Sequence, residues 1–255
     1  MDLGLAGRVA IITGAGRGIG LAHARALGLE GVSIVINDQD STAAMHAVEV
    51  LSAQGINATS QTGDATDPEV VNQTVSFTLE KHGRLDILIN NAGIGVKPAS
   101  EVEHMPLSDW QRMLHIHLDS TFVWSRAAVD PMRKNGYGRI INTSSMNFTG
   151  GGRPGVAHYS AAKAGIVGLT QTMAKEVAKF GLTVNAIAPG YVATELISQF
   201  SADMMDRLKK QNPAGRLCLP EEVAALTTFL ASTHAGFING ELICMDGGRR
   251  DYYWG

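Results

Sequence analysis

The sequence predicts one α/β domain, built as a doubly wound parallel sheet of seven strands with helices on both faces. Short β-branched runs alternate along the chain with longer segments whose apolar residues recur at helical spacing. The short runs are nearly continuous in apolar residues, as is typical of strands covered on both faces. The 255 residues, of which 45% are apolar, suit one large core. We therefore expect a single domain over residues 1–255.

Seven segments are predicted as strands. In chain order they are RVAIIT (8–13), SIVIND (33–38), NATSQTG (57–63), LDILINN (85–91), RIINTS (139–144), LTVNAIAP (182–189) and ELICMD (241–246). The helical patterns at 69–83 and 161–181 end at Gly83 and Gly181, as expected for glycine caps at helix C-termini. The stretch 195–220 follows the sixth strand and has no clear period, and we expect it to form a lid over the substrate site.

Composition and charge exclude several classes of function. The formal net charge is −3 and the Lys and Arg residues are scattered, so a nucleic-acid partner is not expected. No leader pattern and no run of 18 apolar residues is seen, which predicts a cytoplasmic protein that does not enter a membrane. Cys218 and Cys244 lack CxxC spacing, so neither a disulfide framework nor a metal site is expected.

The run TGAGRGIG, from Thr13 to Gly20, follows the first predicted strand and opens a helix. That position places backbone N–H groups and the positive end of a helix where a diphosphate can bind. The second strand ends in Asp38, whose carboxylate can accept hydrogen bonds from ribose hydroxyls. Together these features predict a Rossmann fold that binds NAD, because a carboxylate at the ribose repels the 2′-phosphate of NADP. Arg17 favours NADP instead, which leaves NADP as the alternative cofactor.

The segment YSAAK places Tyr159 and Lys163 four residues apart on one helix face. Ser145 follows the preceding strand, at the edge of the sheet where ligands bind in this fold. A tyrosine needs its pKa of about 10 lowered by about 3 units to transfer protons at neutral pH. Lys163 and a nearby nicotinamide cation could supply that stabilisation, so these three residues are predicted to be catalytic.

With these motifs the sequence resembles the short-chain dehydrogenase/reductase family, of the non-extended type, over nearly its whole length. TGAGRGIG fits TGxxxGxG, NNAG from Asn90 fits a motif after the fourth strand, and YSAAK fits YxxxK. The resemblance implies that Asp64 lies beside the adenine and that the segment from Pro189 to Thr194 contacts the nicotinamide carboxamide. Taken together, the implied cofactor-binding residues are Gly14, Arg17, Gly18, Ile19, Gly20, Asp38, Asp64, Ala65, Asn91, Ala92, Gly93, Tyr159, Lys163, Pro189, Gly190, Val192 and Thr194.

Two departures from the family pattern concern the site. The family's fourth catalytic residue is an asparagine that holds a water in a proton relay, and His117 stands at that position. We expect His117 to act in the relay and, with an unperturbed pKa near 6.5, to slow turnover at acidic pH. His115 lies two residues away and so on another face, which argues against a metal pair. The spacing from Ser145 to Tyr159 is one residue longer than usual, and we expect the extra glycine to reshape the substrate pocket.

The predicted function is interconversion of a secondary alcohol and its ketone by hydride transfer to or from NAD, with Tyr159 as general acid and base. One alternative is an NADP-dependent 3-oxoacyl reductase acting on a carrier protein or on CoA. Gly136 and Phe180 stand where such reductases carry basic docking residues, although Lys134 and Lys179 lie close by. The other alternative is a non-catalytic NAD-binding sensor or scaffold.

The family resemblance implies a homotetramer. The last residues of the chain include Tyr252, Tyr253 and Trp254, which are unlikely to remain in water given their large apolar area. We expect them to be buried at a subunit interface or to line the site of a neighbouring subunit.

Overall fold

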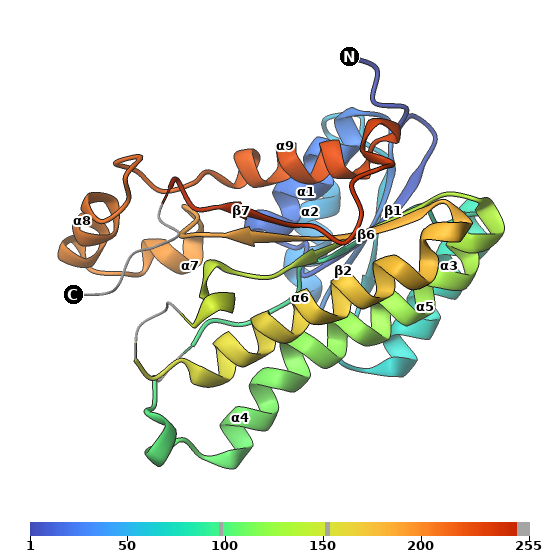
Figure 1. Ribbon diagram of the computed structural model, residues 1–255. Coiled ribbons are helices and arrows are strands. Elements are labelled where there is room, and N and C mark those ends of the chain that lie inside the picture. Colours follow the sequence, from blue (N-terminus) through green and yellow to red (C-terminus); the bar gives the residue numbers. More distant parts are fainter. Residues whose placement is uncertain (97–98, 151–153, 249–255) are drawn as a thin grey trace.

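The computed structural model describes residues 1–96, 99–150 and 154–248, and within them one sheet of seven parallel strands in the order β3-β2-β1-β4-β5-β6-β7 (Figure 1). The strands are β1 (Val9–Thr13), β2 (Ser33–Asp38), β3 (Ala58–Thr62), β4 (Ile87–Asn90), β5 (Gly138–Thr143), β6 (Leu182–Pro189) and β7 (Leu242–Met245). The chain runs outward from β1 to β3 on one side and from β4 to β7 on the other. The carboxyl ends of β1 and β4 therefore form the switch point at which ligands bind in such sheets.

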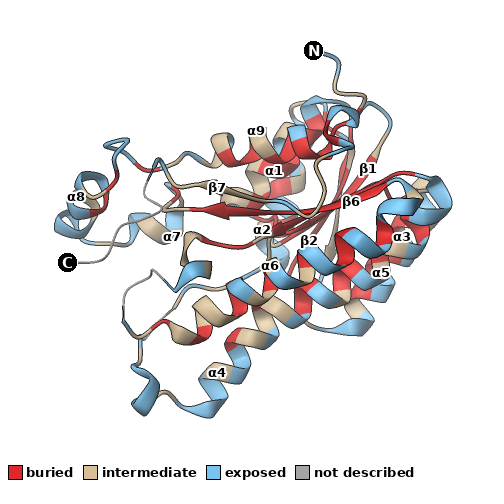
Figure 2. Cartoon of the chain, in the orientation of Figure 1, coloured by how far each residue is buried: buried red, intermediate tan, exposed pale blue. Residues whose placement is uncertain are grey.

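Helices cover both faces of the sheet. They are α1 (Gly18–Leu29), α2 (Ser41–Ser52), α3 (Pro68–His82), α4 (Leu107–Leu114), α5 (Ser120–Asn135), α6 (Ala157–Val177), α7 (Glu195–Ser198), α8 (Ala202–Lys210) and α9 (Pro220–Ala231). One core contains apolar residues of α1, α2 and α9, and a second contains residues of α3, α5 and α6. Figure 2 shows the central strands buried between these two layers, whereas the edge strand β7 is only partly buried. The predicted fold and all seven predicted strands are confirmed, with small shifts at the strand ends.

The two predicted glycine caps, Gly83 and Gly181, end different kinds of helix. Gly83 follows α3 directly and has φ 73°, a left-handed conformation that suits glycine. Gly181, with φ 78°, caps a 3₁₀ turn, η4 (Ala178–Phe180), and α6 itself ends at Val177. The last turn of the predicted helix is thus tightened from α to 3₁₀ geometry, a common way of satisfying the final carbonyl groups of a helix.

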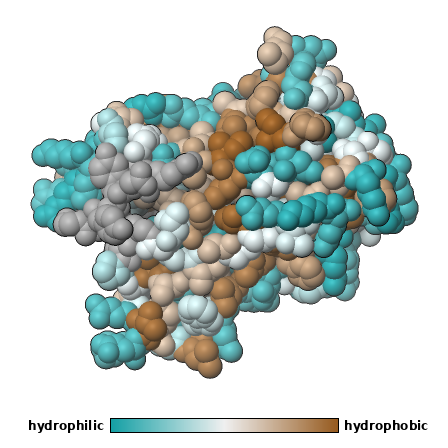
Figure 3. All heavy atoms as spheres, viewed as in Figure 1, coloured by the Kyte–Doolittle hydropathy of each residue, from teal (hydrophilic) through white to brown (hydrophobic). Residues whose placement is uncertain are grey.

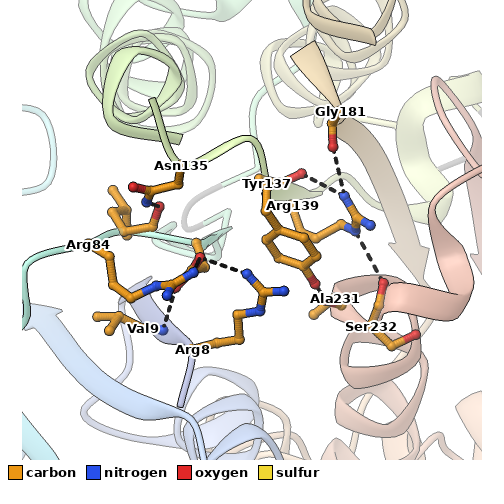
Figure 4. A network of polar contacts seen from close by, with 12 residues as sticks. Arg8, Val9, Arg84, Asn135, Tyr137, Arg139, Gly181, Ala231 and Ser232 are labelled. Atoms are coloured by element: carbon orange, nitrogen blue, oxygen red, sulfur yellow. Dashed lines mark hydrogen bonds and ion pairs between the residues drawn. The ribbon is translucent and has the colours of Figure 1, made fainter. Parts of the chain in front are cut away.

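A polar network fixes the amino ends of the strands (Figure 4). The carboxylate of Asp86 is fully buried and accepts hydrogen bonds from the guanidinium groups of Arg8 and Arg84. The ring of Tyr137 lies 3.5 Å from the Arg8 guanidinium carbon and 4.3 Å from that of Arg139. These contacts join β1, β4 and β5 at their amino ends. The candidate site lies at the opposite edge of the sheet, at the carboxyl ends of the strands.

The segment that carries His117 is one helical rod containing a π-helical turn. It runs from α4 through the turn η2 (His115–Asp119) into α5, and the N–H of Ser120 donates to the carbonyl of His115. π-helical turns inside α-helices occur frequently at functional sites. Here the turn buries His117 and leaves His115 exposed, where it pairs with Asp119 at 3.2 Å. The prediction that the two histidines face different ways is confirmed.

The helices α7 and α8 extend beyond the carboxyl ends of the strands (Figure 1). The space-filling view in Figure 3 shows apolar residues in a band across this face, in the region of α9 and β7, with hydrophilic residues around it.

No helix in the described ranges combines the length and apolar character needed to span a membrane. The same ranges hold no group of three His, Cys, Asp or Glu side chains arranged to hold a metal ion.

Candidate active site

A cleft of about 550 Å³ lies at the carboxyl ends of the strands, between the loops that follow β4, β5 and β6 and the helices α7 and α8. It brings together eleven of the predicted site residues: Ile19, Asn91, Gly93, His117, Ser145, Tyr159, Lys163, Pro189, Gly190, Val192 and Thr194. The other predicted cofactor residues do not line this cleft: Gly14, Arg17, Gly18, Gly20, Asp38, Asp64, Ala65 and Ala92. Most of these eight residues belong to the glycine run, end β2 or follow β3. This is where the residues that bind the adenosine half of a dinucleotide are expected in such a fold.

Two glycines of the run lie too close to their neighbours for a side chain. A Cβ on Gly20 would lie 2.2 Å from the carbonyl oxygen of Gly14, and one on Gly16 would lie 2.9 Å from Oδ2 of Asp38. The Gly16 N–H donates to that same Asp38 oxygen at 2.9 Å, so the acidic residue at the end of β2 also holds the glycine run in place. The first N–H groups of α1 have no acceptor within their own helix. The run is therefore a backbone cradle that fits the diphosphate of a dinucleotide.

The NNAG motif fixes the other side of this cradle. The Nδ2 group of Asn91 donates to the carbonyl oxygens of Thr13 and Gly14 at 3.1 and 3.0 Å. The hydroxyl of Thr13 accepts from the N–H groups of Asn91 and Ala92, each at 3.0 Å. These bonds cross from β1 to β4 at the switch point and hold the two loops at a fixed separation. Asp64, which is exposed, instead accepts two hydrogen bonds from Thr66.

Arg17 is held by a carboxylate that the sequence reasoning did not single out. Its Nη2 atom lies 2.6 Å from Oδ2 of Asp40. Asp40 caps α2 by accepting from the N–H of Ala43, and this bond, with the nearby Arg17, holds the pKa of Asp40 below its usual value. The N–H of Asp40 in turn donates to Asp38. The carboxylates of Asp38 and Asp40 therefore both lie at the end of β2, and Asp40 is the one that pairs with Arg17. The signal in the sequence was an aspartate directly before the serine that starts a helix.

Tyr159, Ser145 and Lys163 converge on the cleft. Burial raises the pKa of Tyr159, and a hydrogen bond with the Ser145 side chain opposes this rise in part. The Nζ of Lys163 lies 5.6 Å from the centre of the Tyr159 ring and donates to the carbonyl of Thr143 at 2.7 Å. Burial lowers the pKa of Lys163 to about 7. The protein alone thus does not lower the pKa of Tyr159, so a phenolate needs added positive charge.

His117 lies against both Tyr159 and the loop after β4. Its ring meets the Tyr159 ring edge-on, with centroids 5.2 Å apart, and the imidazole is only 3% exposed. Its Nε2 atom faces the backbone N–H and carbonyl of Ile94, whereas its buried Nδ1 atom has no hydrogen-bond partner among the described residues. Burial, followed by the charge of Lys163, holds the pKa of His117 well below its ordinary value. The expected acidic fall near pH 6.5 therefore does not fit this neutral histidine.

Sequence reasoning missed most of the apolar lining of the cleft. Residues of this kind are Ile94, Val96, Ala99, Met146, Val156, Ile197, Phe200 and Met204. They come from the loop after β4, from the segment between β5 and α6, and from the predicted lid. No local pattern marks them, because their common position arises only when these segments meet.

The expectations for the extra glycine after Ser145 and for the C-terminal aromatic residues concern segments that lie partly or wholly outside the described residues. The longer connection after Ser145 begins with the 3₁₀ turn η3 (Met146–Thr149), whose first turn Ser145 caps through the N–H of Asn147. The extra glycine belongs to a stretch that includes 151–153, and those residues are not described. Tyr252, Tyr253 and Trp254 also lie outside the described residues.

Comparison with known proteins agrees with this geometry. Residues 14–250 match the family model described as enoyl-(acyl carrier protein) reductase. The chain is 41% identical over 246 residues to 3-oxoacyl-[acyl-carrier-protein] reductase of Synechocystis sp., covering 96% of this chain and 97% of the relative. It is 35% identical over 246 residues to gluconate 5-dehydrogenase of Gluconobacter oxydans, covering 96% and 95% of the two chains.

Solved structures show the same relationship. A variant of a Serratia marcescens short-chain dehydrogenase/reductase superposes with a TM-score of 0.90 at 33% identity, covering 96% of this chain and 99% of that one. The chain belongs to the short-chain dehydrogenase/reductase family and is an oxidoreductase that acts on CH–OH groups with a nicotinamide dinucleotide as acceptor.

Proposed function

We propose that this protein is an NAD-dependent oxidoreductase that interconverts a secondary alcohol and its ketone, with Tyr159 as the proton-transferring group. The observation that carries the proposal is the convergence of Ser145, Tyr159 and Lys163 on one cleft that also reaches Ile19, beside the glycine cradle. When bound, the nicotinamide ring supplies the hydride acceptor or donor. The side chains of the protein then have to hold the substrate oxygen and move one proton.

In alcohol oxidation, the Ser145 hydroxyl donates a hydrogen bond to the substrate oxygen while the Tyr159 phenolate takes the proton of that oxygen. Burial alone works against the phenolate, because it raises the pKa of Tyr159. The hydrogen bond with Ser145 opposes that effect in part, and in its protonated form the Lys163 amine, 5.6 Å from the centre of the ring, would add to the opposition together with the nicotinamide cation. The low pKa of Lys163, about 7, means that the same side chain can give up and regain a proton near neutral pH.

His117 takes the place of the relay asparagine in this proposal. Its buried, unpartnered Nδ1 atom can accept or donate a proton or bind a water. Because Nε2 faces both a donor and an acceptor of Ile94, either tautomer of the ring keeps a partner there. The relay therefore does not require a fixed tautomer of His117.

NAD is the proposed cofactor because the charge at the end of β2 is negative. Asp38 is 9% exposed, and both of its carboxylate oxygens are held by backbone N–H groups. Arg17, the feature that favours NADP, is paired with Asp40. The 2′-phosphate of NADP would meet two carboxylates and one arginine already paired with one of them.

We further propose that residues 195–220 act as the substrate lid, since Ile197, Phe200 and Met204 line the cleft.

A homotetramer is supported by the edge strand β7, all four residues of which remain partly exposed. A cytoplasmic location is supported by Cys218 and Cys244, which are free thiols, as expected in a reducing compartment.

A second candidate function is an NADP-dependent 3-oxoacyl reductase, favoured by the 41% identity to the 3-oxoacyl-[acyl-carrier-protein] reductase of Synechocystis sp.. The charges near the docking positions are compatible with it. Lys134 and Arg133 both pair with Asp130, beside Gly136, and the cations of Arg133 and Lys179 both lie over the ring of Phe180. Three cations and one carboxylate leave positive charge at this place for an acidic carrier. Acetoacetyl-CoA reduction with NADPH, compared with secondary-alcohol oxidation with NAD, separates the two candidates.

The test of the proposed function is NADH formation across a panel of secondary alcohols by the wild type and by Tyr159→Phe. The variant should bind NAD as the wild type does, because only one hydroxyl is lost, yet lose at least about 100-fold in kcat, the range of general acid–base catalysis. NAD binding is followed by titration calorimetry. Turnover within a few-fold of the wild type would remove Tyr159 from the mechanism.

A further inference from the structure

The part of the cleft outside the predicted cofactor and catalytic residues is mainly apolar. Six of its side chains come from three separate segments: Val96, Met146, Val156, Ile197, Phe200 and Met204. None is fully exposed, yet Met204 is 38% exposed and Phe200 is half-buried, so water contacts both at the edge of the cleft. The polar side chains in this part are neutral, and include Asn147 and Tyr191.

Charge is scarce in the cleft. Among the described residues that line it, Lys163 alone has a side chain that carries a charge near neutral pH, and its amine is bound to the carbonyl of Thr143. His117 is buried and faces Lys163, so it remains neutral. An anionic group bound against the apolar side chains would lose its water, and the one cation among the described lining residues, Lys163, lies by Tyr159 with its amine bound to the carbonyl of Thr143, so burial of the anion there is unfavourable. An apolar group would instead cover surface that water now contacts.

We propose that the substrate of this site is an uncharged secondary alcohol, or its ketone, bearing a bulky apolar group such as an aryl, cyclohexyl or longer alkyl group. The inference rests on the proposed function and narrows it. Ser145 and Tyr159 hold the reacting oxygen, and the apolar group lies against Met146, Phe200 and Met204. Hydroxy acids, polyols and acyl thioesters with anionic carriers are excluded as preferred substrates.

The first test uses aryl alcohols with one common framework, of which one carries a negative charge. Oxidation of 1-phenylethanol, of 4-(1-hydroxyethyl)benzoate and of the methyl ester of that acid is measured with NAD at pH 8. The ester and 1-phenylethanol should exceed the carboxylate in kcat/KM by at least about 100-fold. Along the series from 2-butanol to 2-octanol, kcat/KM should rise about fourfold per methylene until the cleft is filled. Equal or better turnover of the carboxylate would overturn the inference.

Matched variants locate the apolar contact. Met204→Ala should raise KM for 2-octanol several-fold and leave the Kd for NAD unchanged, whereas Met205→Ala, one position along α8 and not in the cleft, should change neither. Lys97 and Arg153 lie outside the described residues, so each is replaced by Ala as well. If either replacement abolishes turnover of a preferred carboxylate substrate, an anion site exists and the inference is wrong.

Failure of the inference and failure of the proposed function give different results. A preferred anionic alcohol whose oxidation still depends on Tyr159 contradicts the substrate class alone. Should no alcohol be oxidised, binding decides: titration calorimetry on Tyr159→Phe with NADH compares acetophenone with 4-acetylbenzoate. Tighter binding of acetophenone supports the apolar substrate class, and tighter binding of the carboxylate refutes it.

Discussion

The Nε2 atom of His117 lies 3.3 Å from the backbone nitrogen and 3.1 Å from the carbonyl oxygen of Ile94. One ring nitrogen therefore meets a donor and an acceptor of the same residue. An asparagine side chain would satisfy both groups at once, through its carbonyl oxygen and its amide nitrogen. The single Nε2 atom of the histidine satisfies one of these groups at a time, and its Nδ1 atom has no partner within the described ranges. The substitution thus keeps the contact with the loop after β4 and adds a group able to carry a proton.

His117→Asn should keep kcat within about tenfold of the wild type, because the amide can bond both backbone groups of Ile94. His117→Ala should lose about 10- to 100-fold, since those groups are left without a side-chain partner. The Kd for NAD should change much less than kcat in both variants. Steady-state kinetics and calorimetry measure the two effects. A fully active alanine variant would make His117 a packing residue.

The pH profile provides a separate prediction for His117. Its pKa is held well below 6.5, so its protonation should not affect turnover near neutral pH. The wild type and His117→Asn should therefore have the same pH dependence of kcat/KM between pH 6 and 9. A fall near pH 6.5 in the wild type that is absent from His117→Asn would show that the imidazole titrates normally.

Lys163→Met should stabilise the protein without cofactor while removing most turnover. The pKa of Lys163 falls from 10.5 in the unfolded chain to about 7 in the fold, so between those pH values the unfolded chain binds the extra proton. Stability in the wild type therefore rises with pH across this window by about 1.4 kcal/mol per unit. The advantage of the variant should be largest at pH 7 and shrink toward pH 10. Urea unfolding at pH 7 and pH 9 measures it, and a difference independent of pH would contradict the prediction.

Cofactor preference should depend on Asp40 as well as Asp38. Asp40→Asn removes the charge beside Arg17 and keeps an oxygen that can cap α2, so the ratio of kcat/KM for NAD to that for NADP should fall a few-fold, within the range of an exposed ion pair. Asp38→Asn should lower the ratio further, because Asp38 is buried at the end of β2. Arg17→Ala should reverse the effect of Asp40→Asn. A wild type that prefers NADP would show that Arg17 outweighs both carboxylates.

His23, on α1, is fully buried, neither ring nitrogen has a hydrogen-bond partner in the described part of the chain, and burial lowers its pKa to about 3. Below pH 6.5 the unfolded chain protonates this residue and the fold does not, so the wild type should lose about 1.4 kcal/mol of stability per pH unit from this cause. His23→Leu should abolish that loss, and its advantage in urea unfolding should be larger at pH 5 than at pH 8. The exposed His46→Ala serves as control and should show no such change.

The sequence by itself determined the strands, their alternation with helices, and the motifs. Each of these signals depends on residues close together in the chain. Apolar runs mark the strands, the glycine run follows β1, and Tyr159 and Lys163 lie one helical turn apart. The location of Ser145 near them could also be predicted, because parallel strands end at a common edge of the sheet.

Only the tertiary structure decided the environment of those residues. Asp40 comes to Arg17 across 23 positions, Ile94 comes to His117 across the same number, and the apolar wall of the cleft joins segments from β4 to α8. Burial then set the pKa of Lys163 near 7, that of His117 well below 6.5 and that of Tyr159 above its usual value. The physical reason is that desolvation and contact between distant segments depend on how the whole chain packs, and no local spacing encodes them.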